Sequence, residues 1–244
     1  MEITFNDASK TTTNFLIAAD GINSKVRQQL FPESRKRYSG QTCWRGITNM
    51  VLEDDLLHQG FELWGNTIRF GISKVSKDKT YWFAVVLAKE NEQVEVRLVK
   101  EKLLKMFSEF DPLITDLIAA TDIHQIIKSD IHDLKPLKKW HINNICLIGD
   151  AGHATTPNMG QGGAQAIEDA YYLSNLIAEN KDKNIFELFQ QKRQKKVSLV
   201  VNQSWMTGKM AHWKYGQGFR NFILKSVPKA IINKKMIALY QLQK

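Results

Sequence analysis

The 244-residue chain carries 34 Lys and Arg against 25 Asp and Glu, a formal net charge of +9, and 43% of its residues are hydrophobic. These fractions are those of an ordinary globular protein with a sizeable core, and they exclude disordered and low-complexity classes. No apolar run is long enough to cross a bilayer and the residues after Met1 do not resemble a signal peptide, so we expect a cytoplasmic protein.

The positive charge is concentrated in the tail. Residues 181–244 hold 14 basic and 2 acidic residues, a net +12, whereas residues 1–180 hold 20 and 23, a net −3. The two cysteines, Cys43 and Cys146, lie in apolar strand-like runs. Two such residues form no disulfide framework, so we expect buried free thiols in a reducing compartment.

The first residues predict a β-hairpin followed by a short helix. Ile3–Phe5 and Phe15–Ala19 have strand character on either side of a polar turn at Asn6–Lys10. Asn23–Leu30 predicts a helix that ends before Pro32.

The middle of the chain predicts an antiparallel sheet and two helices. Four segments alternate apolar and polar residues or are rich in aromatics: Gln41–Val51, Phe61–Trp64, Thr67–Ser73 and Tyr81–Leu87. Val94–Phe110 has helical periodicity, Pro112 separates it from a second helix through Ala120, and Ile123–Asp130 is expected to return toward the first domain.

The pattern with the clearest chemistry runs from Ile145 to Ile177. A buried strand at Ile145–Ile148 leads into a Gly149-Asp150 turn, a loop with Pro157, and the cluster Gly160-Gln161-Gly162-Gly163 at the start of a helix. Open α/β sheets hold ligands at the carboxyl ends of their strands, where this carboxylate would lie. Glycines allow close approach of the backbone, and a helix start offers free N–H groups and a positive dipole end. A cofactor with a polyol chain and a ring that gains negative charge suits such a site, and flavin adenine dinucleotide (FAD) is one.

The tail predicts helices at Ile185–Val201 and Gly218–Tyr240. The fold class is therefore α/β: a partial Rossmann-like FAD/NAD(P)-binding domain interrupted by an antiparallel-sheet substrate domain, followed by C-terminal helices. We assign 1–36 and 124–180 to the FAD-binding domain, 37–123 to the substrate domain and 181–244 to the basic C-terminal helices.

Three motifs carry a resemblance to a known family. GDAGHATTPNMGQGGAQAIEDA resembles the second FAD-binding motif of the single-component flavoprotein aromatic hydroxylases, and FLIAADGINSKVRQQLF resembles their Asp-Gly motif. YSGQTCWRGIT is similar to the start of the substrate domain in the branch with urate hydroxylase, salicylate hydroxylase and zeaxanthin epoxidase. The resemblance implies a FAD-dependent monooxygenase that hydroxylates or epoxidises an electron-rich substrate with NADPH or NADH and dioxygen, through a flavin hydroperoxide.

The resemblance also implies roles for individual residues. Asp150 accepts a hydrogen bond from a ribitol hydroxyl of FAD, next to Gly149. Pro157 and the backbone of Gly160, Gln161, Gly162 and Gly163 lie along the pyrimidine edge of the flavin. Asp20, Gly21 and Arg27 help to hold the pyrophosphate or ribose region. The alternatives are a turn-capping Asp150 and a plain strand–turn–helix corner with an Asp20 cap and a surface Arg27.

Other candidate groups are weaker. Arg45 lies among alternating strand residues, where it could contact an anionic substrate or the flavin, or face solvent. His153 is expected to make a structural hydrogen bond rather than to act in catalysis. The six histidines share no ligand spacing with each other or with the cysteines, so we expect no metal site.

One element of the family pattern is missing. Family members open with a Gly-x-Gly-x-x-Gly unit that grips the FAD pyrophosphate, and this sequence has none. We therefore expect the isolated chain to bind FAD weakly or not at all and to be marginally folded, and a separate N-terminal half is a candidate partner. Two alternatives follow: a non-catalytic, truncated remnant acting as an interaction module, and an RNA- or membrane-surface protein whose tail offers Trp205, Trp213, Tyr215 and Phe219 among its lysines. We favour a C-terminal helix pair whose apolar face packs on the flavin domain and whose lysines are solvated, with no nucleic-acid partner and no stable membrane insertion.

Overall fold

The computed structural model describes residues 1–52, 60–179 and 184–242. Backbone contacts divide the chain into two compact units, each made of separate stretches of sequence. The first unit comprises residues 1–39, 132–208 and 224–244, and the second comprises 40–131 and 209–223.

A small sheet in the first unit brings distant segments together. Its three strands have the order β3 (Leu16–Ala18), β10 (Ile145–Leu147) and β9 (His141–Ile142). β10 is parallel to β3 and antiparallel to β9. Parallel strands need a long connection, and here that connection contains the entire 40–131 part of the second unit.

The N-terminal hairpin differs from the prediction. β1 (Glu2–Thr4) pairs with β2 (Lys10–Thr12) rather than with the strand after Phe15. A tight turn forms because the Ala8 N–H donates to Phe5 O and the Phe5 N–H to Ser9 O. The apolar Leu16–Ala18 is thereby left to pair with β10, where Ala18 is buried.

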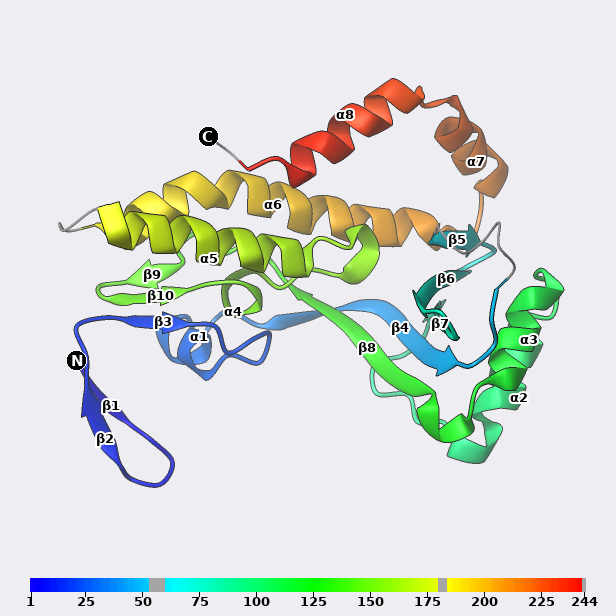
Figure 1. Cartoon of the computed structure of the whole chain (residues 1–244), viewed down its shortest axis with the longest axis horizontal. Coiled ribbons are helices and arrows are strands. Elements are labelled where there is room, and N and C mark those ends of the chain that lie inside the picture. The colour runs from blue at the N-terminus through cyan, green and yellow to red at the C-terminus, as the bar shows by residue number, and fades with distance from the viewer. Residues whose placement is uncertain (53–59, 180–183, 243–244) are drawn as a thin grey trace. The chain divides into compact units, whose positions relative to one another are not determined.

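Helices cover the small sheet. α5 (Gly162–Glu179) and α6 (Ile185–Ala211) lie side by side in Figure 1. They pack on β10 through a core of apolar residues: Trp140, Cys146, Tyr172, Leu173, Phe189, Val197 and Val201. The shorter α1 (Lys25–Leu30) and α4 (Asp150–His153) follow β3 and β10 respectively.

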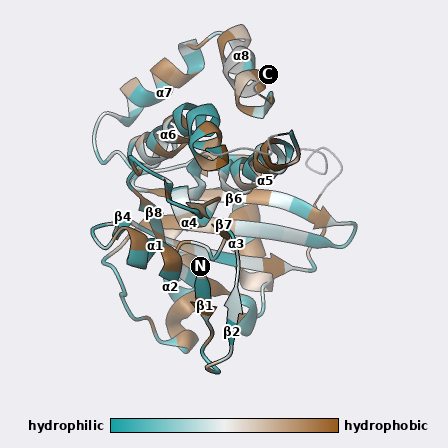
Figure 2. Cartoon of the chain, turned by 90° about the vertical axis from the view of Figure 1, so that its left-hand side faces the viewer, coloured by the Kyte–Doolittle hydropathy of each residue, from teal (hydrophilic) through white to brown (hydrophobic). Residues whose placement is uncertain are grey.

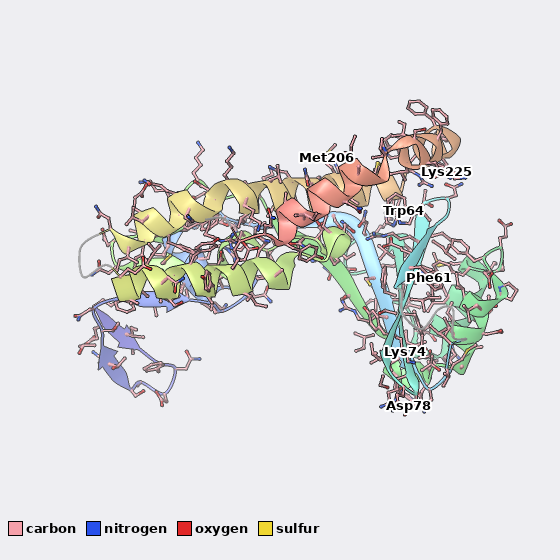
Figure 3. All side chains as sticks on the ribbon, turned by 45° about the horizontal axis from the view of Figure 1, so that its top comes forward. Phe61, Trp64, Lys74, Asp78, Met206 and Lys225 are labelled. Atoms are coloured by element: carbon pink, nitrogen blue, oxygen red, sulfur yellow. The ribbon has the colours of Figure 1, made fainter. Side chains whose placement is uncertain are left out.

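The second unit is a five-stranded sheet with helices on one face. The strand order is β5 (Phe61–Trp64), β6 (Ile68–Ser76), β7 (Lys79–Leu87), β4 (Lys36–Thr48) and β8 (Ile127–Leu134). β5, β6, β7 and β4 pair antiparallel, as the alternating sequence predicted. Figure 3 shows Lys74 and Asp78 at one end of the β6–β7 hairpin and Trp64 toward the other.

The core of this unit lies between the sheet and two helices. α2 (Val99–Met106), after a short turn at Val96–Leu98, and α3 (Pro112–Ala120) pack on the face that carries Trp44, Phe70 and Trp82. The predicted helix from Val94 therefore begins later and ends earlier than expected. A further turn at Ile123–Gln125 leads into β8.

The tail forms helices with one interruption that the sequence analysis missed. The predicted helix Gly218–Tyr240 is two helices, α7 (Gln217–Ser226) and α8 (Lys229–Tyr240). Pro228 lies between them with an extended backbone. Proline has no N–H to donate within a helix, so one continuous helix cannot form here. Figure 2 shows apolar and polar residues mixed along both helices. None of the helices in the described ranges is long and apolar enough to span a membrane.

Residues 209–223 group with the second unit, whereas they were predicted to belong with the rest of 181–244. Gln41 Nε2 lies 3.1 Å from His212 Nδ1, and His212 Nε2 lies 3.3 Å from Val85 O. The Arg220 guanidinium lies 5.4 Å from the ring centroid of Trp64. Side chains distant in sequence make these contacts, so no local pattern could have revealed the grouping.

Candidate functional site

Two of the predicted motifs meet in the first unit. β3 and β10 are parallel neighbours, with Leu16 opposite Ile145 and Ala18 opposite Leu147. The Ile148 N–H donates to Ala18 O at 3.0 Å and extends this pairing by one step. Asp20 and Asp150 each follow the carboxyl end of their strand, so both carboxylates lie at the same edge of the sheet, the usual ligand edge of such sheets.

The turn before Asp150 requires glycine. Gly149 has φ +55° and ψ −142°, a combination that only glycine adopts without strain. A Cβ at this position would lie 3.1 Å from the Ala166 Cβ of α5. The Gly149 N–H donates to Asp169 Oδ2 at 2.9 Å. The turn therefore lies close against α5 at Ala166, and the hydrogen bond to Asp169 of α5 holds it there.

The start of α5 is open beside the Asp150 carboxylate. Asp150 is exposed, and one of its carboxylate oxygens lies 4.0 Å from the point where a Cβ on Gly162 would be. A Cβ added to Gly160 or Gly163 would meet nothing within 4 Å. The first N–H groups of an α-helix have no acceptor within the helix, so this opening presents donors next to a carboxylate acceptor.

Gln161, next to Gly160 and Gly162 in the sequence, carries a buried donor. Its side chain is 1% exposed, and its Oε1 accepts a hydrogen bond from Gln165 Nε2 at 3.2 Å. Among the described residues its Nε2 has no hydrogen-bond partner. A buried amide donor without an acceptor is costly, so a bound ligand that offers an oxygen or ring nitrogen here would remove that cost.

The loop that leads to α5 is fixed by polar contacts. Pro157 starts a single 3-10 turn, Pro157–Met159, and Gly160 ends it in the left-handed region at φ +62°. Asn158 Nδ2 donates to Ser204 O at 3.0 Å, and the Ser204 and Thr156 hydroxyl oxygens lie 2.8 Å apart. α6 therefore holds the loop in a defined position before any ligand binds.

The Asp-Gly motif forms a strand–turn–helix corner, which is the local arrangement that the second of the two alternatives above describes. Asp20 Oδ2 accepts the Lys25 N–H at 2.8 Å, and Ser24 caps α1 by accepting the Arg27 N–H at 2.9 Å. Burial opposes ionisation of Asp20, but hydrogen bonds from Ser24 and from the main chain outweigh burial and lower its pKa. Gly21 adopts φ +76°, which allows the turn between Asp20 and the helix.

Arg27 is a buried link between the two motifs, not a surface arginine. Its side chain is 1% exposed, with Nη1 donating to Ala151 O at 3.0 Å and Nη2 to Ile22 O at 2.6 Å. The guanidinium therefore joins the turn after β3 to α4, which carries Asp150.

A buried charge network supports the Gly149–Asp150 turn from behind. Arg193 of α6 donates through Nε to Asp169 Oδ1 at 2.9 Å and through Nη1 to Glu168. Lys196 Nζ donates to Glu168 Oε1 at 2.7 Å. Arg193 and Asp169 are fully buried. Two cations face two carboxylates, so the formal charge of these four side chains balances.

His153 belongs to this network, and it makes the structural hydrogen bond that we expected. Its Nε2 lies 2.6 Å from Asp169 Oδ2, and its ring lies 4.9 Å from the Trp140 ring. Burial raises the pKa of Asp169, but the contacts with His153, the Gly149 N–H and Arg193 outweigh burial and lower it. Asp169 lies within a motif that is evident in the sequence, but its pairing with Arg193 was not predicted, because 24 residues separate the two and no local spacing joins them.

Arg45 lies in the second unit, on the sheet face opposite α2 and α3. It is opposite Phe83 of β7 and donates through Nη2 to Ser129. Among the described residues its buried Nε has no hydrogen-bond partner. Cys43, Val85 and Ile131 form an apolar cluster on the same face. A partly buried cation on an apolar surface can bind an anionic or electron-rich ring.

Metal ligands do not gather in the part of the chain that the structure describes. No group of three or more His, Cys, Asp or Glu in those residues could hold a metal ion. His58, one of the six histidines considered above, lies outside the described residues.

The two thiols are expected to be unreactive in the folded protein. Cys146 is fully buried, and burial together with the negative charge of Asp169 raises its pKa to about 12. Burial also raises the pKa of Cys43. At pH 8 neither thiol forms the reactive thiolate. We expect slow labelling by a chromogenic disulfide reagent in buffer and rapid labelling of both thiols in denaturant; rapid labelling of the folded chain would contradict this placement.

Sequence comparison places these features in a known family. The sequence profile described as "FAD binding domain" matches residues 4–204, which is more than half of the chain. The chain belongs to the FAD-dependent aromatic hydroxylase family. Its relatives include the 2-heptyl-3-hydroxy-4(1H)-quinolone synthase of Pseudomonas aeruginosa, 33% identical over 93% of this chain and 60% of that protein. The aurachin C monooxygenase/isomerase of Stigmatella aurantiaca is 36% identical over 85% of this chain and 54% of that protein.

The solved structures agree with this family. Klebsiella pneumoniae HpxO, in complex with FAD and uric acid, matches with a TM-score of 0.88 and 27% identity over 98% of this chain and 62% of that one. A salicylate hydroxylase substrate complex has the same fold, with a TM-score of 0.77 and 20% identity over all of this chain and 68% of that one. The chain spans about 60% of the length of the P. aeruginosa synthase.

The residues present fit a flavin. FAD combines a ribitol chain, which needs an acceptor such as Asp150, with a pyrimidine edge that needs donors. The open backbone of Gly160 and Gly163 supplies space at the start of α5, and Gln161, which lies between them in the sequence, carries an Nε2 donor that has no partner among the described residues.

Proposed function

We propose that the chain works as a FAD-dependent monooxygenase that consumes NAD(P)H and dioxygen and acts on an electron-rich aromatic, heterocyclic or polyene substrate. The observation that carries this proposal is the exposed Asp150 carboxylate beside the open start of α5, at the carboxyl end of two parallel strands. When bound, FAD supplies the redox chemistry, since it takes electrons from NAD(P)H and activates dioxygen.

In this proposal the Asp150 carboxylate accepts a hydrogen bond from a ribitol hydroxyl. The N–H groups at the start of α5 and the Nε2 of Gln161 donate to the pyrimidine edge. The positive end of the α5 dipole stabilises negative charge there by roughly 0.3–1 kcal/mol when exposed, and by more in a dry site. Pro157 and Gly160 hold this segment in place.

Arg27 and Asp20 contribute indirectly. Arg27 fixes α4 by binding Ala151 O, and Asp20 organises the start of α1. We propose that both maintain the edge on which the cofactor lies. In the second unit, Arg45 is the residue proposed to contact the flavin or an anionic substrate, because its cationic side chain stands on an apolar face.

The relatives indicate the breadth of possible substrates. Their names refer to a quinolone, to aurachin C and to zeaxanthin, and HpxO is seen with uric acid. All are electron-rich rings or polyenes. We propose a substrate of this broad class without choosing among its members.

The proposal can be tested with flavins that lack the adenosine half. Riboflavin carries the ribitol chain and lumiflavin does not, so their difference in affinity reports the contact with Asp150. A hydrogen bond to a charged group is worth about 1.5–3 kcal/mol, which corresponds to about a tenfold to hundredfold difference in Kd. We expect the wild-type chain to bind riboflavin more tightly than lumiflavin, and Asp150→Ala to abolish the difference. Flavin fluorescence measures both constants.

Asp7→Ala is the matched control, since it removes another exposed carboxylate of the first unit, in the hairpin turn. It should leave the preference for riboflavin unchanged. Equal affinities for the two flavins in the wild-type chain would overturn the assigned role of Asp150. Oxidation of NAD(P)H with FAD and candidate aromatics, absent from Asp150→Ala, separates the enzyme from a non-catalytic remnant.

A further inference from the structure

A basic hollow lies in the first unit, formed by the segment after α1 and the segment after β8. Its volume is about 820 Å³. Six of the residues that line it are cationic and one, Glu33, is acidic: the cations are Arg35, Lys36, Arg37, Lys135, Lys138 and Lys139. Residues 1–180 as a whole carry a net charge of −3, so this concentration of positive charge is local and does not follow from composition.

One of the cations forms a fixed wall of the hollow. Arg37 donates to both carboxylate oxygens of the buried Asp133, through Nε at 2.9 Å and through Nη2 at 2.7 Å. Its guanidinium also lies 3.5 Å from the ring centroid of Trp205. Trp205 is therefore occupied by this contact rather than available as a stacking platform for nucleic acid.

Hydrogen bonds to its backbone hold the lysine-rich segment 135–139 in place. Gln194 Nε2 donates to Leu137 O and Lys138 O, both at 3.0 Å, and Gln190 Nε2 donates to Lys138 O at 2.9 Å. The Gln190 Oε1 accepts the Trp140 N–H at 2.8 Å. Both glutamines project from α6. The segment 135–139 therefore presents its lysines from an ordered backbone, which lowers the entropic cost of binding a ligand.

Among the described residues the remaining five cations form no ion pair, although the charge of Lys139 helps to lower the pKa of Glu187. In the described ranges, none of Arg35, Lys36, Lys135, Lys138 and Lys139 has a carboxylate within ion-pair distance, and Arg35, Lys36 and the three lysines of 135–139 are exposed. Like charges around one hollow repel one another, and an anion with several charges would relieve that repulsion.

We propose that this hollow binds the phosphate groups of a small phosphorylated molecule. Phosphate is the anion that such a set of Lys and Arg donors recognises, and several phosphates match several cations. The volume lies in the range of small-molecule sites and the surface is concave, which favours a small ligand over the extended backbone of a nucleic acid. This proposal does not rest on the proposed flavin chemistry, and it uses none of the residues assigned to that site.

The test measures the binding of inorganic tripolyphosphate to the full chain by isothermal titration calorimetry, at low and at physiological salt. We expect saturable binding that weakens with salt and falls by about tenfold or more in Lys135→Gln/Lys138→Gln/Lys139→Gln. The matched control is Lys77→Gln/Lys89→Gln/Lys195→Gln, which removes the same charge from exposed positions elsewhere. The control should bind as the wild type does, and circular dichroism should show both triple variants folded. Equal weakening in both variants, or no saturable binding, would overturn the proposal.

Competition identifies the source of the phosphate. Displacement of tripolyphosphate by ADP supports a soluble nucleotide. Displacement by phosphatidylcholine vesicles that contain phosphatidylinositol phosphate, but not by pure phosphatidylcholine vesicles, supports a lipid headgroup. Binding of single-stranded RNA with no affinity for tripolyphosphate would contradict a small-ligand site.

Discussion

Replacing Arg193 by methionine is expected to destabilise the first unit by about 3–5 kcal/mol, because it leaves two buried carboxylates with one cation. Among the described residues, Glu168 would keep Lys196 as its cationic partner and Asp169 would keep its contact with His153. Methionine fills a similar space, so the loss is one of charge compensation more than of packing. Chemical denaturation measures the change in free energy of unfolding, and hydrogen exchange shows which amides lose protection.

A second substitution separates charge imbalance from misfolding. Asp169→Asn in the Arg193→Met background removes the uncompensated carboxylate, so the double variant is expected to lose less than the sum of the two single changes. Arg193→Lys keeps the charge but cannot reach Asp169 and Glu168 with one planar group, so we expect partial recovery. A loss of less than about 1 kcal/mol in Arg193→Met would show that the network is not a stabilising centre.

The same network links stability to the proposed site. Asp169 accepts the Gly149 N–H and contacts His153, and these residues begin and end the segment that contains Asp150. A chain that loses Arg193 is therefore expected to lose order in this turn before the sheet itself unfolds. Turn amides that exchange faster than those of β10 in Arg193→Met would show this order of events.

Local rules predicted most of the elements. Phe61–Trp64 matches its predicted bounds, and Tyr81–Leu87 lies within β7, because alternation or a high content of aromatic and β-branched residues is a property of the strand itself. The β10 strand and the helix start at Gly162 were also anticipated, since glycine and carboxylate patterns act over a few residues. The predicted hairpin partner of β1 was wrong. β1 pairs with the polar strand β2 across a tight turn, and the spacing of apolar residues does not predict such a pairing.

The site was predicted only as far as its chemistry is local. Asp150, Gly160 and Gln161 belong to one continuous motif, and the structure groups them at the start of α5. Arg27 was expected to hold the pyrophosphate or ribose region, with a surface position as the alternative, and its guanidinium is buried against a carbonyl 124 positions away. Such partners depend on which strands pair, and the pairing of β3 with β10 is a result of the whole fold.

Replacing Trp82 by alanine is expected to destabilise the second unit by about 3–5 kcal/mol. Trp82 is fully buried, and its ring stacks on Phe70 at a centroid distance of 5.4 Å. Gly46 and Thr121 lie close to its ring, since a Cβ on Gly46 would lie 2.8 Å from Trp82 Cζ2 and 2.9 Å from Thr121 Cγ2. The surroundings cannot collapse into the void without moving a strand, so the cavity cost is near the upper end of the range.

Trp82→Phe is the matched comparison for this core. It keeps most of the apolar area but loses the hydrogen bond from Trp82 Nε1 to Thr121 Oγ1, which is 2.8 Å long. Because Thr121 Oγ1 still donates to Leu117 O, we expect a loss of only about 1–2 kcal/mol from the hydrogen bond and reduced packing. Hydrogen exchange should assign the loss in both variants to amides of β6, β7 and α3, whereas Arg193→Met affects those of α5 and α6. Loss of protection in α5 rather than β7 on changing Trp82 would mean that its core is not the stabilising centre of the second unit.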